Sequence, residues 1–228
     1  MLLGIDHLAI AVDDPDAALS ELASHLGIPA GTSGGRHAAW GTRNRLLWLG
    51  DTFIELCTVF DPSLAQGSWL GRAVLRPRAT TDPTAICWAI STDDLDLDRA
   101  GMNGEGAILG EAVPGERWRP DGQIVRWRLA LPPDVDLERP FLIEHDLNAA
   151  EWTTEDRAER AASPARFVAL ELPVDEIAGF GTSEAPARIG DHLVWAAGRD
   201  TSVPVIEISG LDRGNDEATL LGCRWLLE

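Results

Sequence analysis

A chain of 228 residues in which 45% are apolar and 25% are charged has the composition of a packed globular protein, which excludes general disorder. Its 37 acidic against 19 basic residues give a formal net charge of -18, which would repel nucleic acid phosphates and anionic lipid surfaces. No apolar run approaches the roughly 18 residues that span a bilayer, and three widely separated cysteines form neither a disulfide framework nor a zinc motif. We expect a cytoplasmic protein with neither nucleic acid nor membrane partners.

The first expected element is a strand over residues 5–12. Period-two alternation places Leu8, Ile10 and Val12 on one face, and His7 on the other face beside two alanines. The small side chains around His7 indicate an open cavity on that side of the sheet.

A helix is expected next, over residues 17–26. Asp14 can cap its first turn, Pro15 favours a helix start, and Gly27 favours a stop. Residues 62–75 and 149–162 also have helical character, and we interpret them as helices that connect larger units.

The opening strand recurs twice along the chain. A second copy starts at residue 84, and aligning its Asp-Asp pair with the first such pair puts Cys87 opposite His7. Residues 95–100 then predict a shorter helix, and a third copy begins near residue 166 with little room for any helix. The sequence therefore predicts three modules, at residues 1–80, 81–163 and 164–228, with the third shortened and all packed as one assembly.

Each copy closes with an apolar strand that contains an Ile-Glu pair. These pairs predict inward carboxylates at Glu55, Glu144 and Glu207. Because neighbouring residues of a strand point to opposite faces, His145 is expected to face away from the site that holds Glu144.

The most specific motif lies in the first copy. Residues 34–37 read Gly-Gly-Arg-His, and residues 40–56 run from Trp-Gly-Thr-Arg-Asn into the strand that carries Glu55. This segment resembles the glyoxalase-like domain branch of the vicinal oxygen chelate superfamily. The resemblance implies an α+β fold, in which tandem βαβββ modules form curved mixed sheets around a half-open barrel. It also implies dimerisation, because modules of this superfamily are often shared between chains.

The resemblance further implies a divalent metal on the concave side, with ligands from the first and last strand of each module. The matching positions are His7, Glu55, Cys87 and Glu144, of which Cys87 departs from the family's histidine. Such a set suits Zn, Fe, Mn or Ni, and Glu144 is the expected catalytic proton carrier. The residues alone leave alternatives: Cys87 as a small buried hydrophobe, and the two glutamates neutralised by arginine or backbone donors.

Five residues near the motif are candidates for substrate binding, because they offer polar donors and flat apolar walls to a small carbonyl compound or carboxylate: His37, Trp40, Arg43, Asn44 and Trp48. A salt bridge to the acidic surface is the alternative role for Arg43.

Two functions follow from these patterns. The first is a metal-dependent lyase, isomerase or dioxygenase that acts on a small substrate with vicinal oxygens. The second is a metal-free protein that sequesters a hydrophobic or cationic compound, as the bleomycin-resistance members of the superfamily do. Loss of the family's histidine at Cys87 favours the second function.

Overall fold

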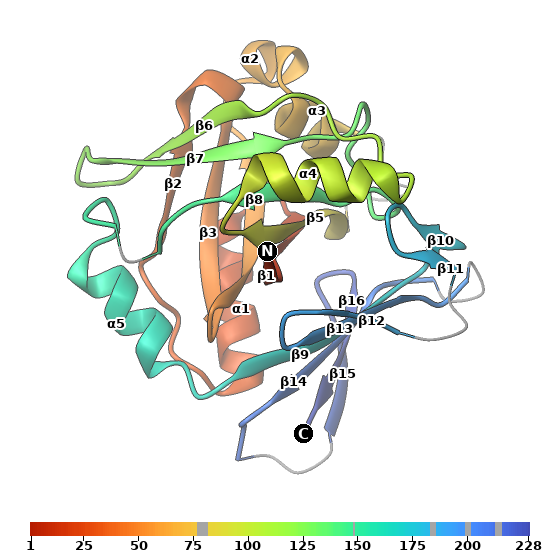
Figure 1. Cartoon of the computed structure of the whole chain (residues 1–228). Coiled ribbons are helices and arrows are strands. Elements are labelled where there is room, and N and C mark those ends of the chain that lie inside the picture. Colours follow the sequence, from red (N-terminus) through yellow and green to blue (C-terminus); the bar gives the residue numbers. More distant parts are fainter. Residues whose placement is uncertain (77–81, 148, 183–185, 199–201, 213–215) are drawn as a thin grey trace.

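The computed structural model describes residues 1–76, 82–147, 149–182, 186–198, 202–212 and 216–228 (Figure 1). Its first module comprises β1 (Leu2–Ala11), α1 (Pro15–Leu26), β2 (Gly34–His37), a 3-10 turn (Ala38–Trp40), β3 (Thr42–Leu49) and β4 (Thr52–Val59). Its second module comprises β5 (Thr84–Thr92), α4 (Leu95–Gly104), β6 (Val113–Trp118), β7 (Ile124–Ala130) and β8 (Phe141–Glu144). Both are βαβββ units, as the repeat predicted.

The eight strands of these modules form one closed barrel, in the order β1-β4-β3-β2-β6-β7-β8-β5. On one side β1 runs antiparallel to β5, and on the other side β2 meets β6 through the pair Arg36 and Trp118. This second contact closes the barrel, whereas the resemblance implied a half-open one.

The helices begin and end where capping chemistry places them. The Asp14 side chain accepts hydrogen bonds from the first turn of α1, and Gly27 ends the helix with a left-handed φ of 70°. The predicted connection over residues 62–75 contains two short helices, α2 (Pro62–Gly67) and α3 (Trp69–Leu75). The second connecting helix, α5 (Thr154–Ala162), starts later than predicted because Thr153 and Asp156 form a capping box there.

The two faces of the barrel wall differ in side-chain size. Leu8, Ile10 and Trp88 point outward and are fully buried against the surrounding helices and the C-terminal strands. Ala9, Ala89, Cys57 and Cys87 point inward, where they fill part of the barrel with small groups. No helix in the described ranges is long and apolar enough to cross a bilayer.

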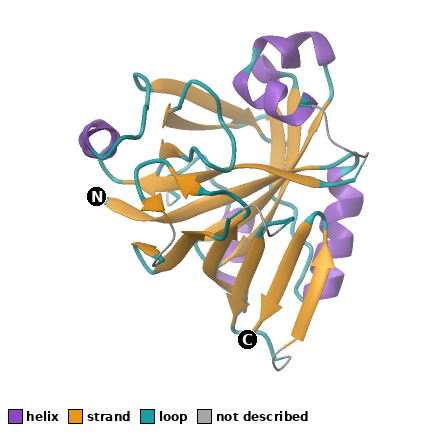
Figure 2. Cartoon of the chain, turned by 90° about the vertical axis from the view of Figure 1, so that its right-hand side faces the viewer, coloured by secondary structure: helices purple, strands orange, loops and turns teal. Residues whose placement is uncertain are grey.

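The C-terminal strands form a second sheet that lies to one side of the barrel (Figures 1 and 2). Its strands are β9 (Arg166–Leu172), β12 (Ala187–Ile189), β13 (His192–Ala196), β14 (Val205–Ser209), β15 (Asp216–Leu220) and β16 (Cys223–Leu227), and β10 (Glu176–Ile177) pairs separately with β11 (Gly181–Thr182). The order β12-β13-β9-β14-β16-β15 repeats the barrel's central order β3-β4-β1-β5-β8-β7, with the same parallel and antiparallel pairings. The sheet therefore holds two half-modules.

This topology changes the interpretation of Glu207. We expected its strand to close the third module, but β14 pairs antiparallel with β9 and parallel with β16, as β5 pairs with β1 and β8. Glu207 thus lies on an opening strand, outside the barrel. The module boundary predicted between residues 80 and 81 lies outside the described residues, and the boundary after residue 163 stays a prediction.

The hairpin between β12 and β13 docks on β1, and this contact offers a test of how the sheet is held. Gly190 has a φ of 57°, and a Cβ there would overlap the backbone oxygen of Leu3. Gly122 has a similar φ of 85° but faces open space. We expect Gly190→Ala to lower the free energy of unfolding by about 1–3 kcal/mol more than Gly122→Ala, because only the first adds a steric clash to backbone strain. Urea unfolding of both variants measures this difference, and equal losses would contradict the docking contact.

Candidate functional site

A pocket lies inside the barrel and opens at its mouth, and its unfilled space, with the open solvent at the mouth included, is about 440 Å³. Aromatic and aliphatic side chains form most of its wall, contributed by strands of both modules and by α3 and the segment before α5. Its polar lining consists of His7, His37, Asn44, Glu55, Arg117 and His145. A mainly apolar cavity with a few convergent polar groups has the character of a small-molecule site.

Glu55 is the central polar group of the cavity and is only 6% exposed. The Nδ2 of Asn44 donates to its Oε1 at 2.6 Å. The Nε2 of His7 lies 3.5 Å from its Oε2, and the Nε2 of His37 lies 3.9 Å from its Oε1. One carboxylate is thus flanked by two imidazole nitrogens from different strands, β1 and β2.

Asp6 holds both His7 and a second histidine of the cavity. The Nδ1 of His7 lies 2.6 Å from Oδ1 of Asp6, and the Nε2 of His145 lies 2.6 Å from Oδ2 of the same carboxylate. Asp6 is 1% exposed. The pairing of β1 with β5 has a register shift between Ile5 and His7. Such an irregularity re-aims side chains, and here the neighbouring residues Asp6 and His7 contact each other. Both histidines donate to the carboxylate, so His7 keeps Nε2 and His145 keeps Nδ1 as the free ring nitrogen.

The pKa values of the cavity groups follow from burial and from these contacts. Burial alone would raise the pKa of Asp6, but the charges and hydrogen bonds of His145 and His7 hold it well below its ordinary range. Burial opposes the charged form of His7, but the hydrogen bond to Asp6 and the charges of Asp6 and Glu55 raise its pKa. Burial lowers the pKa of His37 to about 4, so this imidazole is neutral at pH 7.

Part of the donor set of the cavity fits a divalent metal: among the described residues, the trio whose ligand atoms lie within 4.8 Å of one another includes His37 and Glu55 but not His7. His7 Nε2, His37 Nε2 and the Glu55 carboxylate give two imidazoles and one carboxylate, a set typical of ferrous and zinc sites. The contact from Asp6 to the other nitrogen of His7 is the usual support of a ligating histidine, and Thr42 Oγ1 lies 3.0 Å from Nδ1 of His37.

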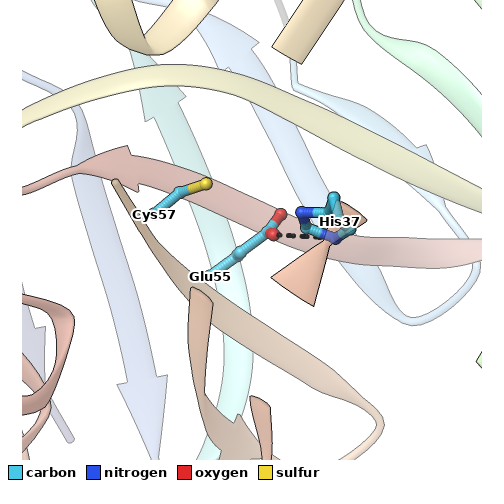
Figure 3. Close-up of side chains that lie close together, drawn as sticks. All are labelled: His37, Glu55 and Cys57. Atoms are coloured by element: carbon cyan, nitrogen blue, oxygen red, sulfur yellow. Dashed lines mark ion pairs between the residues drawn. The ribbon is translucent and has the colours of Figure 1, made fainter. Parts of the chain in front are cut away.

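A cysteine also lies beside this set. Atoms of His37, Glu55 and Cys57 lie within 4.8 Å of one another (Figure 3). Burial raises the pKa of the Cys57 thiol well above its usual range, so the sulfur is protonated while no metal is bound.

Cys87, the doubtful metal ligand of the sequence analysis, does not line the cavity. It is 1% exposed within the apolar cluster at the far end of the barrel, together with Leu70 and Ala73. Burial raises the pKa of its thiol well above the usual range, so it behaves as a small hydrophobe.

Glu144, which the sequence analysis assigned as metal ligand and catalytic residue, does not line the cavity. Glu144 lies on the outer face of β8, where it accepts hydrogen bonds from the backbone N–H of Leu95 at 3.2 Å and from Arg128 at 2.8 Å. Its neighbour His145 lines the cavity instead, opposite to the expectation.

The strand register explains this inversion. The partner of Ala9 on β4 is Glu55, and the partner of Ala89 on β8 is Phe141. Because the Asp-Asp alignment matches Ala9 with Ala89, Phe141 is the counterpart of Glu55. Matching the Ile-Glu pairs instead shifted β8 by three residues, and a shift by an odd number moves every side chain to the other face.

The five predicted substrate-binding residues separate into two groups. His37, Trp40 and Asn44 line the cavity. Arg43 points outward and forms ion pairs with Asp14 and Asp16 on the side of α1, so it is not a cavity residue.

Trp48 is not a cavity residue either. It packs behind the wall against Phe53 and Trp152, at ring-centroid distances of 5.0 and 5.5 Å, and donates from Nε1 to Ser33. Trp48 therefore supports residues that line the cavity.

Sequence reasoning missed Asp6, Arg117 and the aromatic residues Trp69, Trp127 and Trp152. Asp6 precedes His7, and alternation alone would place it on the opposite face. Arg117 stands in the polar run Glu-Arg-Trp-Arg at residues 116–119, which is typical of a solvent-exposed hairpin. Only the closure of the barrel turns this arginine inward, where it is 3% exposed.

A closed barrel of two βαβββ modules with an internal histidine and carboxylate site defines a protein of the vicinal oxygen chelate superfamily. The sequence profile of the family described as "Glyoxalase-like domain" matches residues 5–178, and the chain belongs to this family. A search of curated proteins gives no match.

One solved structure shares the fold, and others match part of the chain. A hypothetical protein from Staphylococcus aureus has 14% identity and a TM-score of 0.75, with 100% of this chain and 99% of that chain covered. A methylmalonyl-CoA epimerase from Streptomyces coelicolor has 21% identity and a TM-score of 0.45, with 63% of this chain and 98% of that chain covered. A hypothetical protein from Bacillus halodurans has 18% identity and a TM-score of 0.45, with 64% and 96% covered. The first extends over the C-terminal sheet as well as the barrel.

Proposed function

We propose that the barrel cavity is a metal-supported active site that moves a proton on a small compound with vicinal oxygens, as a lyase or isomerase does. The observation that carries this proposal is the cluster of His7, His37 and Glu55 inside a mainly apolar cavity. Burial of one carboxylate and two imidazoles is costly unless something compensates them.

His7, His37 and Glu55 would hold the metal. A divalent ion bound there would act as a Lewis acid on the substrate oxygens and lower the pKa of the neighbouring C–H or O–H. Asp6 fixes the orientation of the His7 ring, while Asn44 fixes one oxygen of Glu55. These contacts hold the ligand atoms in place before metal binds.

His145 would carry the proton, in the role that the sequence analysis gave to Glu144. Its Nε2 donates to Asp6, and its Nδ1 is buried without a hydrogen-bond partner among the described residues. A histidine oriented by a carboxylate, with its other nitrogen free, is the usual arrangement of a general base. His145 lines both the cavity and the groove outside its mouth, so a proton taken from the substrate has a route to solvent.

A metal-free binding protein is the second candidate, and Arg117 favours it. The positive charge of this buried arginine acts on both His7 and His37 and would oppose a cation between them. The same charge disfavours the cationic ligand that we considered from sequence, particularly because Glu144 lies outside the cavity. A neutral or anionic apolar compound is the better occupant under this function.

Metal content separates the two candidates. Protein purified without chelators is expected to contain close to one equivalent of divalent metal, and His37→Ala should lose it, because His37 supplies one of only three conventional donors. His25→Ala is the matched control, since His25 lies on α1 outside the barrel and should leave the metal content unchanged. Elemental analysis measures all three proteins. Wild-type protein that contains no metal and cannot be reconstituted would favour the binding function instead.

A further inference from the structure

Arg117 is the one strongly basic group inside the barrel cavity among the residues that the structure describes. It lies on β6 opposite Val125 of β7, and only 3% of its surface is exposed. An arginine so deeply buried normally forms an ion pair or several hydrogen bonds, because the desolvation of an unpaired charge is costly.

This guanidinium lacks such partners in the described part of the chain. Its Nε and one terminal nitrogen, Nη2, are buried and donate to no acceptor, and no carboxylate there lies within ion-pair distance of it. Asp156 and Glu55 act on it only through longer-range charge. Burial lowers the pKa of Arg117 to about 10, so the side chain still carries its positive charge at neutral pH.

The side chain is held in place by stacking. Its guanidinium carbon lies 5.2 Å from the ring centroid of Trp152, which leaves the N–H groups at the edge of the plane free to donate. Trp69 lines the same cavity with a buried Nε1–H that also has no acceptor within the described ranges. The cavity thus presents several N–H groups without an acceptor, and the positive charge of Arg117, which contacts no carboxylate of the described residues.

The wall around these donors is apolar and flat. Phe53, Trp127, Phe141 and Trp152 contribute rings to it, and Leu129 and Ile143 contribute aliphatic surface. An occupant that satisfies both features carries an anionic oxygen pair for the planar guanidinium and an apolar body for the rings.

We propose that Arg117 is the carboxylate-binding residue of the cavity and that the natural ligand is a monocarboxylate with a planar apolar body. This inference rests on the proposed function in that it names the substrate class of the same cavity. It does not require a metal, because the contacts that carry it belong to Arg117 and the aromatic wall.

A pair of probes of equal shape tests the proposal. Phenylacetate and phenylacetamide differ in charge but hardly in volume, and their binding quenches the fluorescence of the cavity tryptophans. In the presence of a chelator, wild-type protein is expected to bind phenylacetate at least about tenfold more tightly than phenylacetamide, because two charge-assisted hydrogen bonds are lost in the amide complex.

Two arginine variants complete the test. Arg117→Met keeps the apolar volume of the side chain and should abolish the preference for the acid. Arg126→Met is the matched control, because Arg126 lies on the neighbouring strand with 59% of its side chain exposed, and it should keep the preference. Should Arg117→Met fail to fold, Arg117→Lys serves instead, and it should reduce the preference severalfold because an ammonium group cannot bind a carboxylate through two parallel bonds.

Equal affinity for acid and amide in the wild type overturns the proposal, as does an undiminished preference in the Arg117 variants. Metal content is measured separately on the same preparations. A chain that binds metal but shows no preference for the acid refutes the carboxylate site and leaves the proposed function standing. A chain that prefers the acid but binds no metal supports the carboxylate site and refutes the metal-supported function.

Discussion

Asp6→Asn is expected to lower the free energy of unfolding by about 3–5 kcal/mol at pH 6, measured by urea denaturation of the metal-free protein. The carboxylate is fully buried and accepts from His7 and His145, one on each oxygen. An asparagine has the same shape but offers one acceptor only, and its amide N–H₂ would face an imidazole N–H. One of the two imidazole N–H groups would then lose its acceptor. The negative charge that stabilises protonated His7 would also be lost.

An exposed aspartate provides the matched control. Asp16 forms an ion pair with Arg43 at the surface, where its side chain is 60% exposed. Asp16→Asn is expected to change the free energy of unfolding by less than about 1 kcal/mol, because solvent screens such pairs. Similar losses in the two variants would contradict the buried network around Asp6.

The cost of Asp6→Asn is expected to depend on pH. The pKa of Asp6 is lower in the folded chain than its ordinary value of 3.8, so its stabilising effect is present above that value and is lost as the pH falls through the folded pKa. The pKa of His7 is raised above 6.5, so the effect of its protonation is present below 6.5 and is lost as the pH rises through the raised pKa. The difference between wild type and variant should therefore be greatest between about pH 4 and the raised pKa of His7.

Glu55→Gln is expected to weaken zinc affinity by at least about a hundredfold, whereas Glu144→Gln should change it by less than about twofold. Glu55 is the only carboxylate among the three proposed ligands, and glutamine removes its charge without changing its size. Glu144 caps α4 and pairs with Arg128 outside the barrel, so its charge does not reach the cavity directly. Competition with a chromophoric chelator measures both affinities.

The two glutamates form a matched pair because both follow an isoleucine near the end of a module. A large loss of affinity in Glu144→Gln, or none in Glu55→Gln, would contradict the cavity as the metal site. The first of these two results would favour instead the arrangement that the superfamily resemblance implied, in which Glu144 is a ligand.

The fold was predictable where local patterns carry the signal. The alternation around His7 and the cap at Asp14 follow from neighbouring residues, and the structure confirms the strand and helix that they predicted. The closing of the barrel depends on Arg36 meeting Trp118, two residues far apart in the chain. No periodicity in one sequence reports such a contact, and the expected barrel was therefore half-open.

The C-terminal sheet shows a second limit. Residues 205–208 resemble a closing strand because they repeat the Ile-Glu pair, yet the pairing of β14 with both β9 and β16 makes it an opening strand. A dipeptide repeat does not identify the position of a strand in a module. Strand partners do, and these are set by packing against the barrel.

The candidate site was partly predictable for the same reason. His37, Asn44 and Glu55 lie within the motif that carries the family resemblance, His7 lies on the opening strand before it, and all four line the cavity. His145 was excluded because a shift of β8 by an odd number of residues reverses inside and outside. Its role follows from its contact with Asp6 across 139 residues of sequence, a separation at which local patterns carry no information.

Titration of the metal-free protein with Co(II), followed by visible absorption, tests the central claim most directly. We predict saturation at one equivalent, with ligand-field bands of a nitrogen and oxygen site and no thiolate-to-cobalt charge transfer, because the three proposed ligands supply only nitrogen and oxygen. His7→Ala should abolish these bands. The absence of saturable binding in the wild type, or a strong thiolate band, would contradict a metal centre formed by His7, His37 and Glu55.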